Sequence, residues 1–405
     1  MTKVYTHLNE ILTLKEAYAK DGRKLLANDC SIIKDGAIVF DEEKILWVGK
    51  TPELPEEYKS IKPIDLSGHV LTPELVDSHT HVVFAGDRAQ EYTDRLNGTS
   101  YEEIAKRGGG ILYTVKQTQS TSAQDLFEIA CERIERIHSY GVGTIEIKSG
   151  YGLDFAKEME LSLVIDRLKQ KFSPKIQIFN TYLAAHDVPK SFVSPAEYMK
   201  QVVIPLLEKL APLKIIDAVD IFHEKNYFSS DDVKLLFEKA RSLGISRKIH
   251  ADELNTNGGA ELACEFEALS ADHLLKISPE GIYKLATTST VATLLPGTAF
   301  FLGKPLAPAR ALLDQGAKVA IGSDFNPGSC HCDNVLMVAS ISAAQLKLNQ
   351  AELWSAITHN AAHALGLPTQ GALILGMQPR FTLFKAESVS HITYNWGKNL
   401  ATELL

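Results

Sequence analysis

The sequence predicts an α/β fold, a TIM-like (β/α)₈ barrel with a small β-sandwich module built from the N- and C-terminal segments. From Gly68 onward, short β-branched runs alternate with longer amphipathic stretches, which is the pattern of βαβ units around a parallel sheet. The chain has 405 residues, more than one hydrophobic core usually holds, so a barrel with an accessory module fits its length.

Eight such runs can be counted, which is the number of strands that closes this kind of barrel. They lie at residues 75–79, 143–148, 176–182, 218–222, 248–250, 269–273, 291–295 and 318–324. Between the first two runs, the apolar residues of segment 126–138 recur at the spacing of one helix face, and Gly141 offers a stop. This segment is predicted to be a helix that packs on the sheet.

The two ends of the chain show a different pattern. Short apolar pieces at 37–40 and 44–49, separated by acidic and Asp-Gly turns, predict antiparallel strands. Residues 380–384 and 391–394 show the same alternation. We therefore expect residues 1–66 and 367–405 to build one small module, with residues 67–366 forming the barrel between them.

Charge and composition exclude several classes of protein. The net charge of −8 is spread along the chain and no arginine-rich arm occurs, so nucleic acid is not an expected partner. No apolar run approaches the roughly 18 residues that span a bilayer, so no membrane partner is expected. Five scattered cysteines and an N-terminus without a secretory pattern favour a reducing cytoplasm.

Two histidines separated by one residue close the first expected barrel strand. Alternate side chains of a strand point the same way, so His79 and His81 face one side. Their nitrogens can converge on one metal ion, and active sites of such barrels lie at the C-terminal strand ends. The pair alone is only moderately specific, because hydrogen-bonded core histidines give the same pattern.

Other potential ligands and acids follow later strands. His250 closes the fifth strand, His273 the sixth and Asp324 the eighth. Imidazoles with one carboxylate suit zinc or iron and leave a position for water, which is typical of a catalytic metal site. Glu253, just after the fifth strand, is the candidate proton shuttle, and Asp252 is a less favoured competitor. The alternative interpretations are that Asp324 caps a turn and that Glu253 is an exposed acid on a loop.

Four stretches indicate the type of protein more specifically than the histidine pair does. They lie at residues 84–88, 147–153, 294–302 and 323–329. The second contains Lys-Ser-Gly-Tyr-Gly and the fourth contains Asp-Phe-Asn-Pro-Gly. On these stretches the chain resembles the imidazolonepropionase family, the histidine-degradation members of the amidohydrolase superfamily. The resemblance runs over almost the whole chain.

This resemblance implies one Zn²⁺ or Fe³⁺ ion per subunit, with the ligand set His79, His81, His250 and Asp324. It also implies that seven residues contact a small-molecule substrate: Arg88, Tyr151, His186, Glu253, Asn326, Gly328 and Ser329. Arg88 offers a planar fork that suits a carboxylate, and Tyr151 and His186 could bracket a flat ring. The alternative interpretations are that Arg88 forms an ion pair on the surface and that Tyr151 and His186 are buried core residues.

The implied reaction is the hydrolysis of the ring C–N amide bond of 4-imidazolone-5-propanoate to N-formimidoyl-L-glutamate, in the degradation of histidine to glutamate. The catalytic residues would be Glu253 or Asp324, which accept a proton from water, and His273, which stabilises the carbonyl oxygen. Two alternatives remain, a sister aminohydrolase acting on a heterocycle and a non-catalytic binding protein. A homodimer is expected by analogy with similar barrels.

Some positions depart from the family's pattern. Residues 330–332 read Cys-His-Cys where small polar residues are expected, His223 stands where cysteine is common, and Glu74 replaces a glycine. No metal is expected at 330–332, because one compact group lacks a second ligand pair. Lys148 and Glu224 raise the question of a second, bridged metal, but Lys148 lies one strand early, so one metal is predicted.

Overall fold

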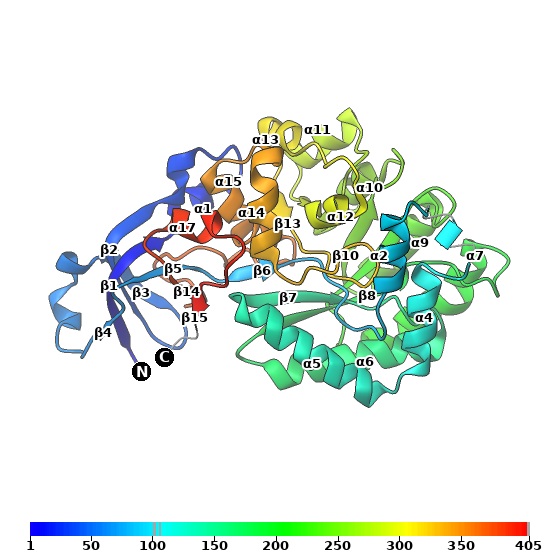
Figure 1. Cartoon of the computed structure of the whole chain (residues 1–405), viewed down its shortest axis with the longest axis horizontal. Helices are drawn as coiled ribbons and strands as arrows, with labels where there is room; N and C mark the ends of the chain where they lie inside the picture. Colours follow the sequence, from blue (N-terminus) through cyan, green and yellow to red (C-terminus); the bar gives the residue numbers. More distant parts are fainter. Residues whose placement is uncertain (100–102, 105–106, 403–405) are drawn as a thin grey trace.

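The computed structural model describes residues 1–99, 103–104 and 107–402, and it contains the expected eight-stranded parallel sheet (Figure 1). The strands follow one another round the sheet in chain order. They are β6 Leu75–Asp77, β7 Val142–Lys148, β8 Gln177–Ala185, β9 Ala218–His223, β10 Ser246–Ala251, β11 Ser270–His273, β12 Val291–Leu294 and β13 Val319–Ile321. The predicted barrel strands are therefore confirmed.

The first and last barrel strands meet just beyond their ends. Thr80 and Phe325 form an isolated parallel bridge, and the His81 N–H donates to the Phe325 carbonyl at 2.9 Å. The Asp324 N–H donates to the His79 carbonyl, also at 2.9 Å. The seam that closes the barrel thus joins the two segments that carry three of the predicted metal ligands.

Helices cover the outside of the barrel (Figure 1). In chain order they are α2 Ala89–Leu96, α4 Ile111–Ser120, α5 Ala123–Ser139, α6 Phe155–Phe172, α7 Pro195–Tyr198, α8 Ile204–Leu210, α9 Ser230–Ser242, α10 Gly259–Glu265, α11 Pro279–Thr287, α12 Pro296–Leu302, α13 Ala309–Gln315, α14 Val335–Leu346, α15 Gln350–Ala356 and α16 His359–His363. Helix α5 confirms the amphipathic segment: Ser122 accepts from the Asp125 N–H at its start, and Leu126, Ile134 and Ile137 are buried. None of the described helices has the length and apolar character needed to cross a membrane.

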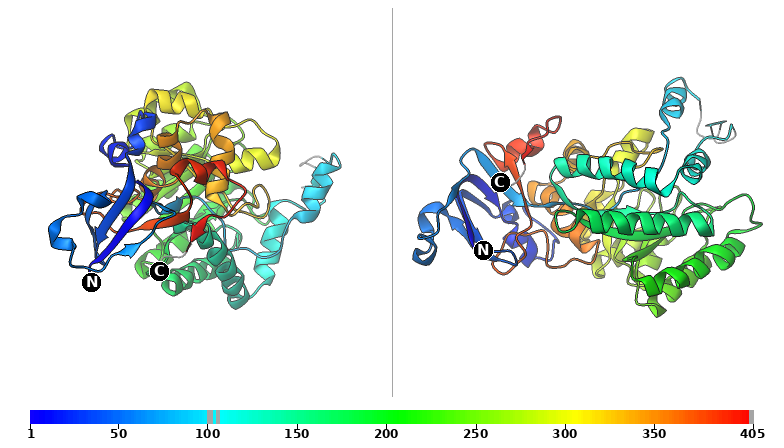
Figure 2. Two further views of the ribbon diagram at one scale, coloured as in Figure 1. Left: turned by 60° about the vertical axis from the view of Figure 1, so that its left-hand side comes forward. Right: turned by 90° about the horizontal axis from the view of Figure 1, so that it is seen from below.

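The two ends of the chain form one seven-stranded sheet beside the barrel (Figures 1 and 2). Its strands are β1 Lys3–Leu12, β2 Ile32–Phe40, β3 Ile45–Lys50, β4 Ile64–Asp65, β5 His69–Pro73, β14 Phe381–Lys385 and β15 Ala401–Thr402. Strand β14 pairs with β5 in antiparallel register, so the C-terminal segment completes the sheet that the N-terminal segment begins. Short helix α1, Lys15–Ala19, follows β1.

Three details of this module correct the sequence-based expectation. Strand β5 belongs to it, so the N-terminal contribution continues past residue 66. Strand β1 pairs in parallel with both β4 and β5, so the sheet is mixed. Residues 391–394 are not a strand but lie in helix α17, Val389–Tyr394, because Ser388 caps its start and Val389 and Ile392 share a buried helical face.

Glu74, directly before strand β6, joins the small module to the barrel. Its carboxylate accepts from Arg380 Nε and from Thr144 Oγ1, each at 2.6 Å. Arg380 Nη2 in turn donates to the Gly143 carbonyl at 2.7 Å. A Cβ on Gly143 would lie 2.1 Å from Glu74 Oε2, so the glycine makes room for the carboxylate.

Replacing Glu74 with alanine should lower the free energy of unfolding by about 2 kcal/mol, because the half-buried Arg380 guanidinium then loses its carboxylate. Urea denaturation followed by circular dichroism would measure the change. Glu43→Ala, at an exposed position, should change stability by less than about 0.5 kcal/mol. Equal losses in the two variants would contradict the proposed link.

Candidate metal centre and active site

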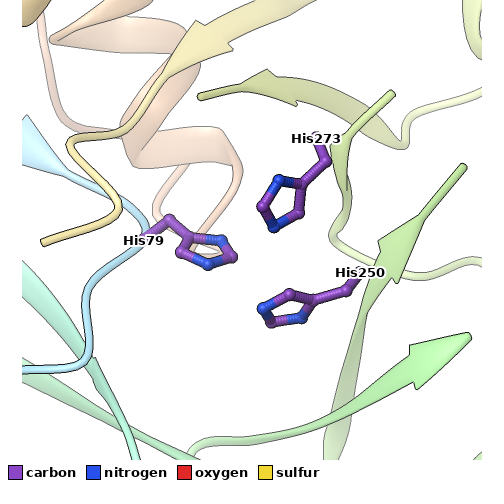
Figure 3. A group of neighbouring side chains, drawn as sticks. All are labelled: His79, His250 and His273. Carbon is purple, nitrogen blue, oxygen red and sulfur yellow. The ribbon is translucent and has the colours of Figure 1, made fainter. Parts of the chain in front are cut away.

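The predicted ligands come together at the C-terminal ends of the barrel strands. Nitrogen atoms of His79, His250 and His273 all lie within 4.8 Å of one another, and Figure 3 shows the three rings turned toward a common space. A second, overlapping group consists of His79, His81 and Asp324. Every member of both groups is buried. The structure therefore also brings His273, predicted as an oxyanion-stabilising residue, within reach of the ligand set.

Asp324 lies between the paired histidines of the first strand. Its Oδ1 atom is 3.5 Å from His79 Nε2 and 3.5 Å from His81 Nε2. Thr298 Oγ1 donates to the other oxygen, Oδ2. The backbone of Asp324 has a left-handed φ of 52°, a conformation that is uncommon outside glycine and recurs at functional sites.

Two buried aspartates orient two of the histidines. Asp272 Oδ2 lies 2.7 Å from His79 Nδ1, and Asp220 lies 3.1 Å from His250 Nδ1. Among the described residues, the Nε2 atoms of both rings have no hydrogen-bond partner although they are buried. An Nδ1–H donated to a carboxylate leaves the Nε2 lone pair free, which is how metal-binding histidines are usually held. The donor set therefore fits a metal ion.

Burial and charge act differently on these two imidazoles. Burial, together with the Lys148 charge, lowers the pKa of His79 well below 6.5, which favours the neutral ring that a metal requires. Burial would also lower the pKa of His250, but the adjacent Asp220 carboxylate outweighs it and the pKa is raised. A more basic His250 is a stronger donor but competes more readily with protons.

A layer of buried ionic side chains lies beneath the histidines. Lys148 Nζ is 2.7 Å from Asp220 and 2.8 Å from Glu146, and Lys248 Nζ is 2.9 Å from Glu146 and 3.7 Å from Asp272. Burial alone would lower the pKa of Lys148, but the neighbouring carboxylates outweigh it and raise the pKa. The Lys148 ammonium group is thus enclosed by carboxylates, as a buried charge requires.

The candidate proton shuttle lies beside this group. Glu253 Oε2 is 3.8 Å from His273 Nε2, and the Glu253 side chain is 15% exposed. Asp252 is turned away from that role because its carboxylate accepts the backbone N–H groups of Asn257 at 2.7 Å and Ala260 at 3.0 Å. Of the two acids, only Glu253 therefore keeps its carboxylate beside the histidines.

Arg88 and Gly328 lie in direct contact. A Cβ on Gly328 would be only 1.8 Å from Arg88 Nη1, so any side chain there would displace the guanidinium. Glu91 Oε2 accepts from Arg88 Nε at 2.8 Å, which leaves the outer guanidinium nitrogens facing the Gly328 loop. Asn326 builds that loop: its Oδ1 accepts the N–H groups of Gly328 and Ser329, each at 2.8 Å.

Tyr151 and His186 stand beside the buried histidine cluster. The His186 ring stacks on His81 with centroids 5.1 Å apart, and Tyr151 lies 5.4 Å from His186. Gly150, at a φ of 111° that favours glycine, offers its carbonyl to His186 Nδ1 at 3.1 Å. Burial lowers the pKa of His186 to about 3, so the ring is neutral. Two flat rings therefore border the space above the ligands.

Another cluster consists of Asp21, His359 and His363. Helix α16 supplies the two histidines, and the turn after α1 supplies the acid. Lys318 Nζ lies 2.7 Å from Asp21 and 2.8 Å from His363 Nδ1. The ammonium group therefore holds the position that a cation would take. At residues 330–332 both cysteines are free thiols and the His331 ring packs on Phe325 at 5.1 Å, so this segment is a packed loop.

Sequence reasoning missed the residues behind the ligands. They are Glu146, Asp220, Lys248 and Asp272, together with Thr298, which binds Asp324. The available signal was an ionisable residue inside an otherwise apolar strand, as in Ala-Val-Asp-Ile-Phe at 218–222. Such a residue must be paired when the strand is buried, because an isolated buried charge is costly.

The chain matches no protein-family model. It is 39% identical over 396 residues to the imidazolonepropionase of Bacillus cytotoxicus, covering 97% of this chain and 92% of the relative. It is 37% identical over 374 residues to that of Bdellovibrio bacteriovorus, covering 91% and 87%. The chain belongs to the imidazolonepropionase family. The family resemblance found in the sequence is therefore confirmed.

More distant solved structures share the fold of this imidazolonepropionase family member. A triazine hydrolase variant aligns with a TM-score of 0.70 at 15% identity, over 99% of this chain and 92% of the other. Atrazine chlorohydrolase from Arthrobacter aurescens TC1, complexed with zinc, gives 0.67 at 16% identity, over 95% and 88%. Guanine deaminase from C. acetobutylicum gives 0.65 at 16%, over 95% and 91%. At this identity the likeness shows the fold alone.

Replacing Asp272 with asparagine should lower metal affinity about 10- to 100-fold, because His79 then loses the anionic partner that fixes its tautomer. Metal content after dialysis against a weak chelator would show the loss. Asp217→Asn is the matched control, since Asp217 pairs with Lys169 at 2.8 Å away from the histidines. Full retention of metal by the Asp272 variant would contradict this role.

Proposed function

We propose that this chain hydrolyses the ring C–N amide bond of 4-imidazolone-5-propanoate to give N-formimidoyl-L-glutamate in histidine degradation. The observation that carries the proposal is the 37–39% identity, over most of the chain, to proteins named imidazolonepropionase. The contact of Arg88 with the loop that follows Asp324 supports it, since the proposed substrate carries both a carboxylate and a ring. This favours the reaction over deamination of a heterocycle and over a non-catalytic role.

The metal would be held by His79, His81, His250 and Asp324. When bound, such an ion lowers the pKa of water to about 7 and so makes hydroxide available at neutral pH. Zinc and iron(III) both suit these nitrogen and oxygen donors. We propose one ion per subunit, because Lys148 is engaged by Asp220 and Glu146.

The substrate would be oriented by residues on three sides. The outer nitrogens of Arg88 suit the propionate carboxylate, which a bidentate guanidinium binds more specifically than an ammonium group. Tyr151 and neutral His186 would flank the imidazolone ring. The loop of Asn326, Gly328 and Ser329 would close the carboxylate end of the pocket.

Proton transfer would be divided between two neighbouring residues. Glu253 would accept the proton of the attacking water and return it to the ring nitrogen as the C–N bond breaks. His273, 3.8 Å from Glu253, would donate a hydrogen bond to the carbonyl oxygen as negative charge develops there. Asp324 is the alternative base, but its two oxygens face His79, His81 and Thr298.

We also propose a cellular compartment and an assembly state for the enzyme. The scattered free cysteines favour the cytoplasm as its compartment. Association as a homodimer remains a proposal by analogy with other barrels of this kind. The proposed partners are otherwise limited to the small-molecule substrate.

Glu253→Gln should lower kcat about 100- to 10,000-fold, because the amide cannot accept a proton, while KM changes little. Loss of ultraviolet absorbance from freshly made 4-imidazolone-5-propanoate would measure turnover, with and without chelator. The unmodified protein should open the ring without releasing ammonia and should stop when its metal is removed. Wild-type kcat in the variant would contradict the base, and no turnover by metal-loaded protein would contradict the substrate.

Gly328→Ala should raise KM about tenfold or more, because the new methyl group would displace the Arg88 guanidinium. The effect on kcat should be smaller, since the proton-transfer residues are untouched. Steady-state kinetics would separate the two constants. Gly397→Ala is the control, since a Cβ there meets nothing within 4 Å, and an unchanged KM at Gly328 would argue against carboxylate binding by Arg88.

A further inference from the structure

The loop that carries Glu253 is held by a buried carboxylate on the neighbouring strand. Glu224 directly follows β9, is 2% exposed, and lies across from residues 254 and 255. Its Oε2 atom accepts the backbone N–H of Leu254 at 2.8 Å and that of Asn255 at 3.2 Å. These two amides belong to the residues immediately after the proposed proton shuttle.

The other oxygen of the same carboxylate is also engaged. Glu224 Oε1 accepts from Asn255 Nδ2 at 3.0 Å and from the Lys225 backbone N–H at 3.0 Å. All four donors are amide N–H groups, so the carboxylate acts as an anionic acceptor for a loop. Hydrogen bonds to a charged acceptor are roughly twice as strong as neutral ones.

The residue before Glu253 is also held in place by hydrogen bonds, which its own carbonyl and carboxylate accept. Asp252 has a left-handed φ of 51°, and its carbonyl accepts the Lys276 N–H at 2.7 Å. Its carboxylate caps the turn that follows, accepting from Asn257 at 2.7 Å and Gly258 at 3.0 Å. Glu253 is thus the single residue between two anchored segments of backbone.

Besides these anchors, Thr256 Oγ1 donates to the Lys276 carbonyl at 2.7 Å. Leu254 is 39% exposed, so the loop gains little from apolar packing at that position. Glu253 nevertheless has to keep its carboxylate beside His273, now at 3.8 Å. A displacement of about 1 Å in a reacting group can lower a rate about 100-fold, so the anchoring of this backbone matters for catalysis.

We propose that Glu224 is a positioning residue that sets the place of the Glu253 carboxylate through the backbone amides of Leu254 and Asn255. This inference rests on the proposed function, because Glu253 must be the proton shuttle for it to hold. It also gives a role to the acid that raised the question of a second metal. Glu224 holds a loop and does not bridge ions.

Glu224→Gln is the sharpest probe because it keeps the shape of the side chain. In either orientation of the new amide, an NH₂ group would face N–H donors, so at least two of the four hydrogen bonds are lost. We expect kcat to fall about 10- to 100-fold with KM within about threefold and metal content unchanged. Hydrogen exchange at the amides of residues 254 and 255 should quicken.

Glu352→Gln is the matched control. Glu352 is a 4% exposed carboxylate that accepts the Asn349 N–H at 2.8 Å and pairs with Arg310, away from the histidines. Its loss should lower stability without lowering kcat and without changing exchange at 254 and 255. If this variant loses kcat as Glu224→Gln does, general destabilisation explains the effect and the positioning role is overturned.

A double-mutant cycle separates this inference from the proposed function. If Glu224 acts only through Glu253, adding Glu224→Gln to the Glu253→Gln protein should lower the residual kcat less than twofold. Additive losses, or a wild-type kcat in Glu224→Gln beside an inactive Glu253→Gln, would overturn the positioning role alone. A fully active Glu253→Gln would overturn the proton shuttle as well.

A second variant covers the case in which Glu224→Gln does not fold. Asn255→Ala removes only the Nδ2 donor and leaves the three backbone hydrogen bonds to Glu224. It should lower kcat about two- to fivefold, speed amide exchange at 254 and leave metal content intact. Unchanged kcat together with unchanged exchange would contradict the proposal.

Discussion

The site depends on a buried layer of charged side chains that holds the imidazoles from below. Asp220 and Asp272 each accept from one histidine, and Lys148 lies within 2.7 Å of Asp220 and 3.7 Å of Asp272. These carboxylates would be costly in a barrel core if they were unpaired. Because each of them contacts both a lysine and a histidine, ring orientation is tied to the packing of the barrel interior.

Barrel closure adds a second constraint on the same site. The Thr80–Phe325 bridge sets the register between the ends of the first and eighth strands. His79, His81 and Asp324 therefore face one another. A slip of one residue at this seam would turn alternate side chains away from the centre. The mixed sheet outside the barrel joins both chain ends, and Glu74 connects that sheet to the start of the barrel.

The loops above the strands are organised by acids whose oxygens accept backbone amides. Glu158 accepts from Gly152 at 2.6 Å and Leu153 at 3.1 Å and so shapes the segment of Tyr151, as Glu224 does for Glu253. Strand ends alone do not fix loop conformation, because loops lack a regular hydrogen-bond ladder. Buried carboxylates fix the loop conformation where the proposed chemistry requires a side chain to keep one position.

The sequence by itself determined the eight barrel strands, because β-branched runs and helical periodicity are local signals. It also predicted which histidines end the strands, since alternation along a strand fixes the facing of His79 and His81. It failed at residues 391–394, where Ser388 caps a helix that the local alternation does not reveal. Only the tertiary structure decided that Asp220 meets His250, that Gly328 lies against Arg88 and that Glu224 reaches Leu254. These pairs join segments up to 240 residues apart, and no local pattern encodes a contact made by the closing of the barrel.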